Sequence, residues 1–389
     1  MTALTMNFAS PRLMLVAGGA VKQIADVLAK FGLRRPLVVT DPFMVKSGHV
    51  RHCIDPLEAA RLSVGVFSDT VPDPTDTVVE AGVAVLREGD YDCLIGFGGG
   101  SPIDTAKAMA ILAAGGGKMR DYKAPFAADK GALPVIAIPT TAGTGSEATR
   151  FTIVTDEATS EKMLCAGLAF LPMAAVVDYE LTLGKPARLT ADTGIDSLTH
   201  AIEAYVSRRA NAFSDAMARS AMQLIAPHIR TACSEPGNLV AREAMMLGAH
   251  HAGIAFSNAS VALVHGMSRP IGAFFHVPHG LSNAMLLPAV TAWSAPAALG
   301  RYADCARAMG LAGAELGDQA AVALLLEELA ALNRDLGVPT PRAHGISAAR
   351  WDELTSEMAR QALASGSPAN NPRVPDAAEI VALYGEVYG

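Results

Sequence analysis

The chain lacks the long apolar runs that membrane spans require. Its 389 residues are 51% hydrophobic, yet the longest apolar-looking run, residues 163–177, is only fifteen residues long and is broken by Gly167 and Pro172. A transmembrane helix needs about 20 consecutive apolar residues. The first residues, MTALTMNFAS, contain no basic stretch followed by an apolar core, so we expect no signal peptide. The composition therefore predicts a soluble chain without a membrane partner.

Cysteine and positive charge are also scarce. The five cysteines are odd in number and scattered along the sequence, which is typical of reduced thiols in the cytoplasm. The formal net charge is -7 and no basic patch is present, so the sequence does not indicate a nucleic-acid partner. We therefore expect a cytoplasmic protein. Its 389 residues exceed the usual size of one hydrophobic core, which predicts two domains.

Short apolar runs alternate with helical patterns in the first half. The expected strands are 36–40, 62–67, 93–97 and 134–138, and the expected helices are 20–31, 75–88 and 102–114. Buried strands separated by helices are typical of a parallel sheet with helices on both faces. A hairpin is expected over 152–162, and 176–178 is one further candidate strand. We expect a Rossmann-like, parallel-sheet α/β domain over residues 1–186.

Small and polar residues follow three of these strands. Asp41 follows the first, GGGS (98–101) follows the third, and PTTAGTGSE (139–147) follows the fourth. Ligands of parallel sheets bind beyond the carboxyl ends of the strands, where glycines and a free helix start can hold a phosphate. No G-x-G-x-x-G is present, and each loop alone could be an ordinary turn. Together they favour a dinucleotide, and Asp41 favours NAD over NADP because it would repel a 2′-phosphate.

The second half has helical patterns only. The expected helices are 189–207, 212–232, 239–256, 260–275, 280–291, 348–364 and 377–384. Pro227 and Pro270 fall inside two of them, where we expect a kink or a split. Residues 187–389 are therefore expected to form an all-helical domain.

Two segments of this helical half offer spaced metal ligands. Asp196 and His200 are four residues apart and share one helix face. His265 and His279 lie in the later segment VHGMSRPIGAFFHVPHG. One carboxylate and three imidazoles suit a borderline divalent metal that keeps a position open for substrate. A lone histidine on a helix is usually structural. From spacing alone, a metal site and a set of structural histidines are therefore equally good interpretations.

The motifs together resemble the iron-containing (group III) alcohol dehydrogenase family across nearly the whole chain. The matching segments are GGGSPIDTAKA at 98–108, PTTAGTGSE at 139–147, RLTADTGIDSLTHAIEAYVS at 188–207, VHGMSRPIGAFFHVPHGLSNAMLLP at 264–288 and NNPR at 370–373. Several segments in the right order and spacing make this resemblance highly specific.

The resemblance implies an N-terminal NAD(P)-binding domain and a C-terminal, dehydroquinate synthase-like helical domain that binds one divalent iron, sometimes zinc. The family's metal ligands correspond to Asp196, His200, His265 and His279. The candidate cofactor contacts are Asp41, Asp73, Gly98, Gly99, Gly100, Ser101, Asp104, Thr140, Thr141, Thr144, Ser146 and Lys162. The implied reaction is hydride transfer between a nicotinamide and a small alcohol or aldehyde, with the metal as Lewis acid. A homodimer or higher homo-oligomer is expected by analogy.

One position departs from the family pattern. Much of the family has a second histidine four residues after the first in this segment, whereas this chain has Arg269. Arginine stays protonated and cannot take the alcohol's proton. In one interpretation Arg269 only packs, and the proton leaves through ribose hydroxyls, water or His276. In the other, Arg269 pairs with a carboxylate or other anion on the substrate, such as a semialdehyde acid or its hydroxyacid.

Related activities remain as alternatives. A glycerol dehydrogenase-like or maleylacetate reductase-like protein would share the architecture, but the HGM…PHG spacing and the intact set of four ligands favour the iron-type alcohol dehydrogenases. A third alternative is a non-enzymatic metal-binding protein. Such a protein would need no pair of phosphate-binding loops, so the two loops in this sequence argue against it.

Overall fold

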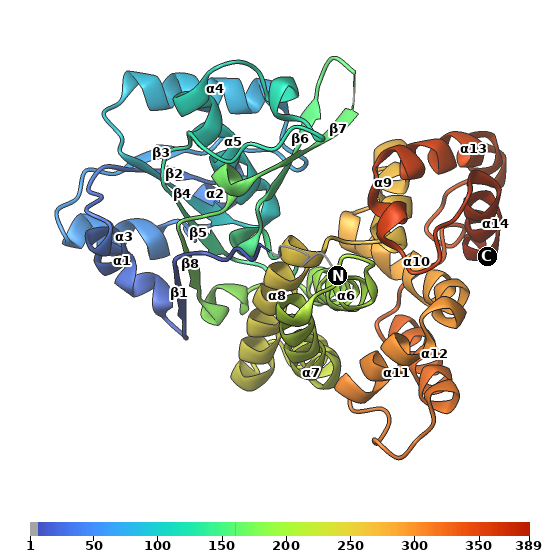
Figure 1. The fold of residues 1–389 in the computed structure, drawn as a ribbon. Coiled ribbons are helices and arrows are strands. Elements are labelled where there is room, and N and C mark those ends of the chain that lie inside the picture. Colours follow the sequence, from blue (N-terminus) through green and yellow to red (C-terminus); the bar gives the residue numbers. More distant parts are fainter. Residues whose placement is uncertain (1–6, 160) are drawn as a thin grey trace, which may run out of the picture. The chain divides into compact units, whose positions relative to one another are not determined.

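The computed structural model describes residues 7–159 and 161–389, which divide into two compact units (Figure 1). The first unit ends at Gly184 and the second begins at Lys185. The first is built on a parallel sheet with helices and the second is helical, which confirms the expected fold class.

The sheet of the first unit has six strands, all paired in parallel. They are β1 (Leu13–Val16), β2 (Pro36–Val39), β3 (Gly65–Phe67), β4 (Cys93–Gly98), β5 (Val135–Pro139) and β8 (Ala174–Val177), in the order β1-β8-β5-β4-β2-β3. The four inner strands are buried at every residue, as expected when helices cover both faces. Leu37 and Val39 belong to one core cluster and Val38 to the other, because successive side chains point to opposite faces.

The helices of the first unit fill the connections between strands. They are α1 (Ile24–Lys30), α2 (Pro42–Lys46), α3 (Arg51–Ala59), α4 (Asp76–Glu88) and α5 (Gly100–Gly115). Residues of α4 and α5 pack in one core cluster, and residues of α1 and α3 pack in the other. The strand order reverses between β2 and β4, since β3 continues the sheet on one side and β5 on the other. Ligands of such sheets bind beyond the strand ends at this reversal, where Asp41 follows β2 and residues 98–101 follow β4.

The expected hairpin is formed by β6 (Phe151–Asp156) and β7 (Glu161–Ala166), which pair antiparallel. β1, α2 and α3 lie outside the elements expected from the sequence. β1 is a four-residue strand at the edge of the sheet with alternating burial, so it lacks the continuous apolar run of the inner strands.

The second unit contains nine α-helices in the described chain. They are α6 (Ala187–Val206), α7 (Ala212–Ser234), α8 (Leu239–Ala259), α9 (Leu263–Phe275), α10 (His279–Ser294), α11 (Leu299–Ala308), α12 (Asp318–Asp335), α13 (Ala348–Ala364) and α14 (Ala377–Tyr388). Across residues 7–159 and 161–389, every helix is too short or too polar to cross a membrane.

Of the kink or split expected at two prolines, the structure excludes the split. α7 runs through Pro227 and α9 runs through Pro270. A proline removes one backbone hydrogen bond, but packing on both sides can hold the helix together. In α7, Ile225 and Ile229 flank the proline and are fully buried.

Candidate functional site

Three of the ionisable side chains of α6 lie on one buried face and belong to one cluster. Asp196, His200 and Glu203 are spaced by four and three residues, so they lie one above another along the helix. All three are buried, with 2–4% of each residue exposed. Buried ionisable groups require partners, because an isolated charge is costly away from water. The neighbouring helices α9 and α10 provide these partners.

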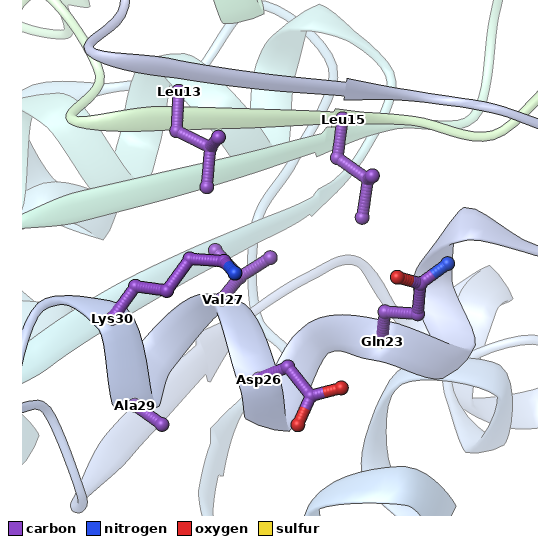
Figure 2. Close-up of a pocket in the computed structure, with 7 residues that line it drawn as sticks. All are labelled: Leu13, Leu15, Gln23, Asp26, Val27, Ala29 and Lys30. Atoms are coloured by element: carbon purple, nitrogen blue, oxygen red, sulfur yellow. The ribbon is translucent and has the colours of Figure 1, made fainter.

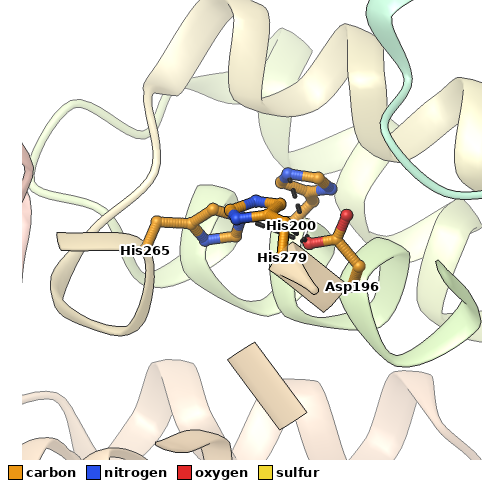
Figure 3. A group of neighbouring side chains, drawn as sticks. All are labelled: Asp196, His200, His265 and His279. Atoms are coloured by element: carbon orange, nitrogen blue, oxygen red, sulfur yellow. Dashed lines mark ion pairs between the residues drawn. The ribbon is translucent and has the colours of Figure 1, made fainter. Parts of the chain in front are cut away.

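The four expected ligands converge inside the helical unit (Figure 3). Asp196 Oδ1 lies 3.4 Å from His265 Nε2, 3.7 Å from His279 Nε2 and 3.8 Å from His200 Nε2. His265 comes from the first turn of α9, and His279 is the first residue of α10. Each side chain offers one ligand atom, and these atoms all lie within 4.8 Å of one another.

This arrangement fits a single metal ion. An ion bound tetrahedrally with metal–ligand distances of about 2.1 Å has ligand atoms roughly 3.4 Å apart. The distances from Asp196 Oδ1, 3.4 to 3.8 Å, are close to that value. The side chain of His279 is 41% exposed while the Asp196 side chain is 3% exposed. The site is therefore open on the His279 side, where a substrate oxygen could enter.

The electrostatics of the site keep its carboxylate ionised. Burial by itself would raise the pKa of Asp196, but the imidazoles of His200, His279 and His265 lower it well below its usual range. Burial would lower the pKa of His265, but Glu203 and Asp196 raise it to about 9. Protons and a metal ion therefore compete for the same nitrogen and oxygen atoms of these side chains, as is usual for metal ligands.

Glu203 is a functional residue that the sequence reasoning missed. Its Oε2 lies 2.6 Å from His265 Nδ1, and its Oε1 accepts the Val264 N–H at 2.6 Å. Metal-binding histidines usually donate their second ring nitrogen to such a carboxylate, which fixes the tautomer and the orientation of the ring. Its spacing from Asp196 and His200 on one face of α6 is the signal that could have identified it.

Asn283 is a second residue that was missed. It lies one turn after His279 on α10 and is fully buried. Its Nδ2 donates to Asp196 Oδ1 at 2.7 Å. The four-residue spacing from His279 is the only sequence signal for this contact.

Arg269 lies one helical turn after His265 on α9 and is partly buried. Within the part of the chain that the structure describes, its side chain forms no hydrogen bond or ion pair. Burial lowers the pKa of Arg269, and the Glu203 carboxylate opposes that effect. His276 ends α9 in a left-handed conformation, with φ 55°, and is exposed.

The two glycine- and threonine-containing loops of the first unit touch each other. The Thr140 N–H donates to the Gly98 carbonyl at 2.8 Å. A Cβ on Gly100 would lie 2.9 Å from Thr144 Cγ2, so a larger residue would push the loops apart. Gly98 has φ 150°, and a Cβ there would lie 2.6 Å from the Pro102 ring. Gly99 caps the start of α5, so free N–H groups of that helix face the end of β4.

The hydroxyls of these loops differ in their surroundings. Ser101, Thr141 and Thr144 are partly buried, whereas Thr140 is 1% exposed. The Thr140 hydroxyl has no hydrogen-bond partner among the described residues. A buried hydroxyl without a partner is unusual and is explained if a ligand supplies one.

Asp104 and Ser146 bond to each other and to groups inside the first unit. Asp104 Oδ1 accepts from Ser146 Oγ at 2.5 Å, and Asp104 Oδ2 accepts the Ile153 N–H at 3.0 Å. Lys107, which the sequence reasoning did not single out, is fully buried beside them and donates to Ser146 Oγ at 3.0 Å and to the Phe151 carbonyl at 2.8 Å. These contacts fasten the second loop to α5. Burial lowers the pKa of Lys107 to about 8.

The remaining candidate cofactor residues occupy loop positions. Asp41 caps α2 by accepting the Met44 N–H at 3.0 Å through Oδ1. Asp73 has φ 51° and forms an ion pair of 2.9 Å with Lys162 of β7. The structure therefore brings Asp73 and Lys162 together.

A separate groove lies between β1 and α1 (Figure 2). Leu13, Leu15, Gln23, Asp26 and Lys30 are among the residues that line it. It contains none of the candidate site residues and has no cluster of groups suited to catalysis.

Comparisons with known proteins identify the family of the chain. Residues 11–179 match the family model described as iron-containing alcohol dehydrogenase, and residues 190–388 match the model of the C-terminal part of the Fe-containing alcohol dehydrogenase family. The NAD-dependent methanol dehydrogenase of Bacillus methanolicus is 36% identical over 378 residues, covering 97% of this chain and 98% of the relative.

Two solved structures are similar over the whole chain. A 1,3-propanediol oxidoreductase has a TM-score of 0.94 and 34% identity, covering 99% of this chain and 100% of its own. The sulfoacetaldehyde reductase of Bifidobacterium kashiwanohense, solved in complex with NAD+, has a TM-score of 0.89 and 28% identity, with 100% of both chains covered.

Proposed function

Because the chain belongs to the iron-containing alcohol dehydrogenase family, we propose that it is a metal-dependent, NAD-linked alcohol dehydrogenase or aldehyde reductase. The observation that carries this proposal is the convergence of one carboxylate and three imidazoles within 4.8 Å. When bound, the metal supplies Lewis-acid polarisation of the substrate oxygen, and the nicotinamide supplies or accepts the hydride.

The proposed metal is Fe²⁺, with Zn²⁺ as the other candidate, held by Asp196, His200, His265 and His279. The mixed nitrogen and oxygen donor set suits both ions. Glu203 holds the His265 ring so that Nε2 faces Asp196. The exposed edge of His279 is where the substrate approaches.

The proposed cofactor is NAD rather than NADP. Residues 98–101 and the hydroxyls of Thr140, Thr141 and Thr144 would hold its phosphates and ribose. Asp73, in the loop before α4, and Lys162 of the hairpin form an ion pair and are the further candidate contacts. Asp104 and Ser146 act by holding the loops together. Asp41 follows β2 at the reversal of strand order, where a carboxylate accepts ribose hydroxyls and repels a 2′-phosphate. Two similar proteins support this choice, since one is an NAD-dependent methanol dehydrogenase and the other was solved in complex with NAD+.

The proposed substrate class is a small aldehyde or alcohol with an anionic group, such as a semialdehyde acid or its hydroxyacid. Arg269 supports this class, because its guanidinium is partly buried one turn from His265 and has no hydrogen bond or ion pair among the described residues. A guanidinium in such a place binds carboxylates well. One similar reductase is named for sulfoacetaldehyde, an aldehyde that carries an anionic group.

The proposed route for the alcohol's proton uses His276 or solvent, because Arg269 cannot accept it. His276 is exposed and lies three residues before His279 in the sequence. An imidazole there can exchange a proton with water.

A coupled assay tests this function. The protein is stripped with a chelator, reloaded with Fe²⁺ without oxygen or with Zn²⁺, and mixed with NADH and a panel of neutral and carboxylated aldehydes. With an aldehyde and NADH, we expect a metal-dependent loss of NADH absorbance. With an alcohol and NAD, we expect a metal-dependent gain. Failure of every aldehyde, together with failure to bind NADH, would contradict the proposal.

We also propose a cytoplasmic homodimer or higher homo-oligomer. All five cysteines are free thiols, as expected in a reducing compartment. β1 is at the edge of the sheet and has exposed Met14 and Val16, which favours association with another copy. Light scattering during gel filtration would give the mass, and a monomer at assay concentrations would contradict this part.

A further inference from the structure

Asn283 contacts most of the proposed metal ligands. Its amide nitrogen lies 2.7 Å from Asp196 Oδ1, 3.1 Å from His265 Nε2 and 3.3 Å from His279 Nε2. The side chain is fully buried on α10, one turn after His279. One nitrogen thus lies within hydrogen-bonding distance of three of the four ligand atoms.

Only the donor half of this amide is used. Asn283 Oδ1 is buried and has no hydrogen-bond partner among residues 7–159 and 161–389. A buried carbonyl without a partner is unfavourable, so hydrogen bonding by the oxygen does not explain an asparagine at this position. The amide nitrogen, in contrast, faces Asp196 Oδ1, His265 Nε2 and His279 Nε2. These are the atoms that would bind a metal ion.

We propose that Asn283 is a positioning residue of the metal centre. While the metal is absent, one N–H of Asn283 donates to Asp196 Oδ1 and the other donates to Nε2 of His265 or of the neighbouring His279. The bond to Asp196 persists when the metal binds. A carboxylate oxygen has more than one lone pair, so Asp196 Oδ1 can accept from Asn283 and also bind the ion. A neutral imidazole has one acceptor nitrogen, so the contacts to His265 and His279 end when the metal arrives.

This role lowers the cost of metal binding. Ligand atoms that are already in place lose little freedom when the ion arrives, and ligands locked by neighbouring hydrogen bonds keep the productive geometry. The inference rests on the proposed function, since it requires a metal at these four ligands. Substitution of groups that support metal ligands typically weakens metal binding by roughly 10- to 100-fold, which is the effect that we expect here.

The test measures Zn²⁺ affinity in the full-length, chelator-stripped protein by competition with a chromogenic chelator. Asn283→Leu removes the amide and keeps a similar size. Asn283→Ser is a smaller polar variant that remains informative if the leucine variant does not fold. Asn333→Leu is the matched control, because Asn333 Nδ2 donates to the Ala284 carbonyl of α10 at 2.7 Å and no hydrogen bond of its side chain in the described chain reaches a ligand.

We expect the Zn²⁺ dissociation constant to rise by roughly 10- to 100-fold in both Asn283 variants and to stay within about twofold in Asn333→Leu. At the same Zn²⁺ concentration, Zn²⁺ should also raise the melting temperature of each Asn283 variant by less than it raises that of the wild type, because stabilisation by a ligand falls as its dissociation constant rises. Unchanged affinity in both Asn283 variants would overturn the inference alone. Absence of Zn²⁺ binding by the wild type would instead overturn the proposed function.

Discussion

Glu203 Oε2 lies 2.6 Å from His265 Nδ1, in a contact between residues 62 positions apart in the sequence. The other oxygen of the same carboxylate accepts the Val264 N–H at 2.6 Å. Glu203 therefore joins the first turn of α9 to α6, and so joins two parts of the proposed metal site. The contact also determines which nitrogen of His265 faces Asp196.

The first prediction concerns this carboxylate. Glu203→Gln keeps the size of the side chain but removes its charge, so the orientation and basicity of His265 are less well maintained. We expect metal affinity to fall by roughly 10- to 100-fold, measured by chelator competition. Glu386→Gln, at an exposed position of α14, is the control and should leave the affinity unchanged. Equal affinities for the two variants would contradict the role given to Glu203.

The second prediction concerns Arg269 and substrate charge. Arg269→Ala should lower kcat/KM for carboxylated aldehydes by roughly 10- to 100-fold, because a charge-assisted hydrogen bond contributes about 1.5–3 kcal/mol. The kcat/KM for neutral aldehydes of the same length should change by less than about threefold, because they have no charge for Arg269 to bind. The measurement is steady-state NADH oxidation with matched substrate pairs.

Two further variants control for the loss of an arginine. Arg269→Lys keeps a positive charge and should recover part of the activity on carboxylated substrates. Arg350→Ala removes an exposed arginine paired with Glu353 and should change neither activity. An equal loss on neutral and carboxylated substrates in Arg269→Ala would show that Arg269 does not recognise an anion.

The third prediction concerns the buried Lys107. Burial lowers its pKa in the folded protein from 10.5 to about 8, whereas in the unfolded chain the pKa stays near 10.5. Between these values the unfolded state binds more protons, so the contribution of Lys107 to stability rises with pH. From below the folded pKa to above the unfolded pKa, the free energy of unfolding gains about 3 kcal/mol from this group, since one pKa unit corresponds to about 1.4 kcal/mol.

Urea unfolding of the wild type and Lys107→Met from about pH 7 to pH 10 measures this contribution. The methionine variant removes the titrating group and controls for other residues, including the buried cysteines. The free energy of unfolding of the wild type should rise relative to the variant as the pH increases. A difference that is constant with pH would show that Lys107 does not titrate in this range.

The sequence predicted most of the elements that carry the site. Continuous apolar runs identified the inner strands, because a strand covered on both faces needs apolar residues throughout. The four-residue spacing of Asp196 and His200 placed both on one face of α6, and the structure brings His265 and His279 to them. From spacing alone, convergence of the two segments was an open question, because sequence periodicity gives faces of helices and not the packing between them.

The supporting residues were harder to predict. Glu203 and Asn283 have ligand-like spacings from His200 and His279, but a carboxylate or amide on a helix is usually exposed, and its burial depends on tertiary packing. Lys107 lies in an alanine-rich helix, and its contacts with Ser146 and Phe151 depend on how the loop after β5 folds back. A split at Pro227 or Pro270 was excluded only by the structure, because tertiary packing can hold a helix together across a lost hydrogen bond.

The central claim is that Asp196, His200, His265 and His279 bind one divalent metal that the reaction requires. Titration of chelator-stripped protein with Fe²⁺ in the absence of oxygen, with bound metal and NADH-coupled turnover recorded at each step, tests it most directly. We expect bound metal and turnover to rise together and to saturate at one ion per chain, and we expect His265→Ala to lose both while still binding NADH. Full turnover by metal-free protein, or unchanged metal binding and turnover in His265→Ala, would contradict it.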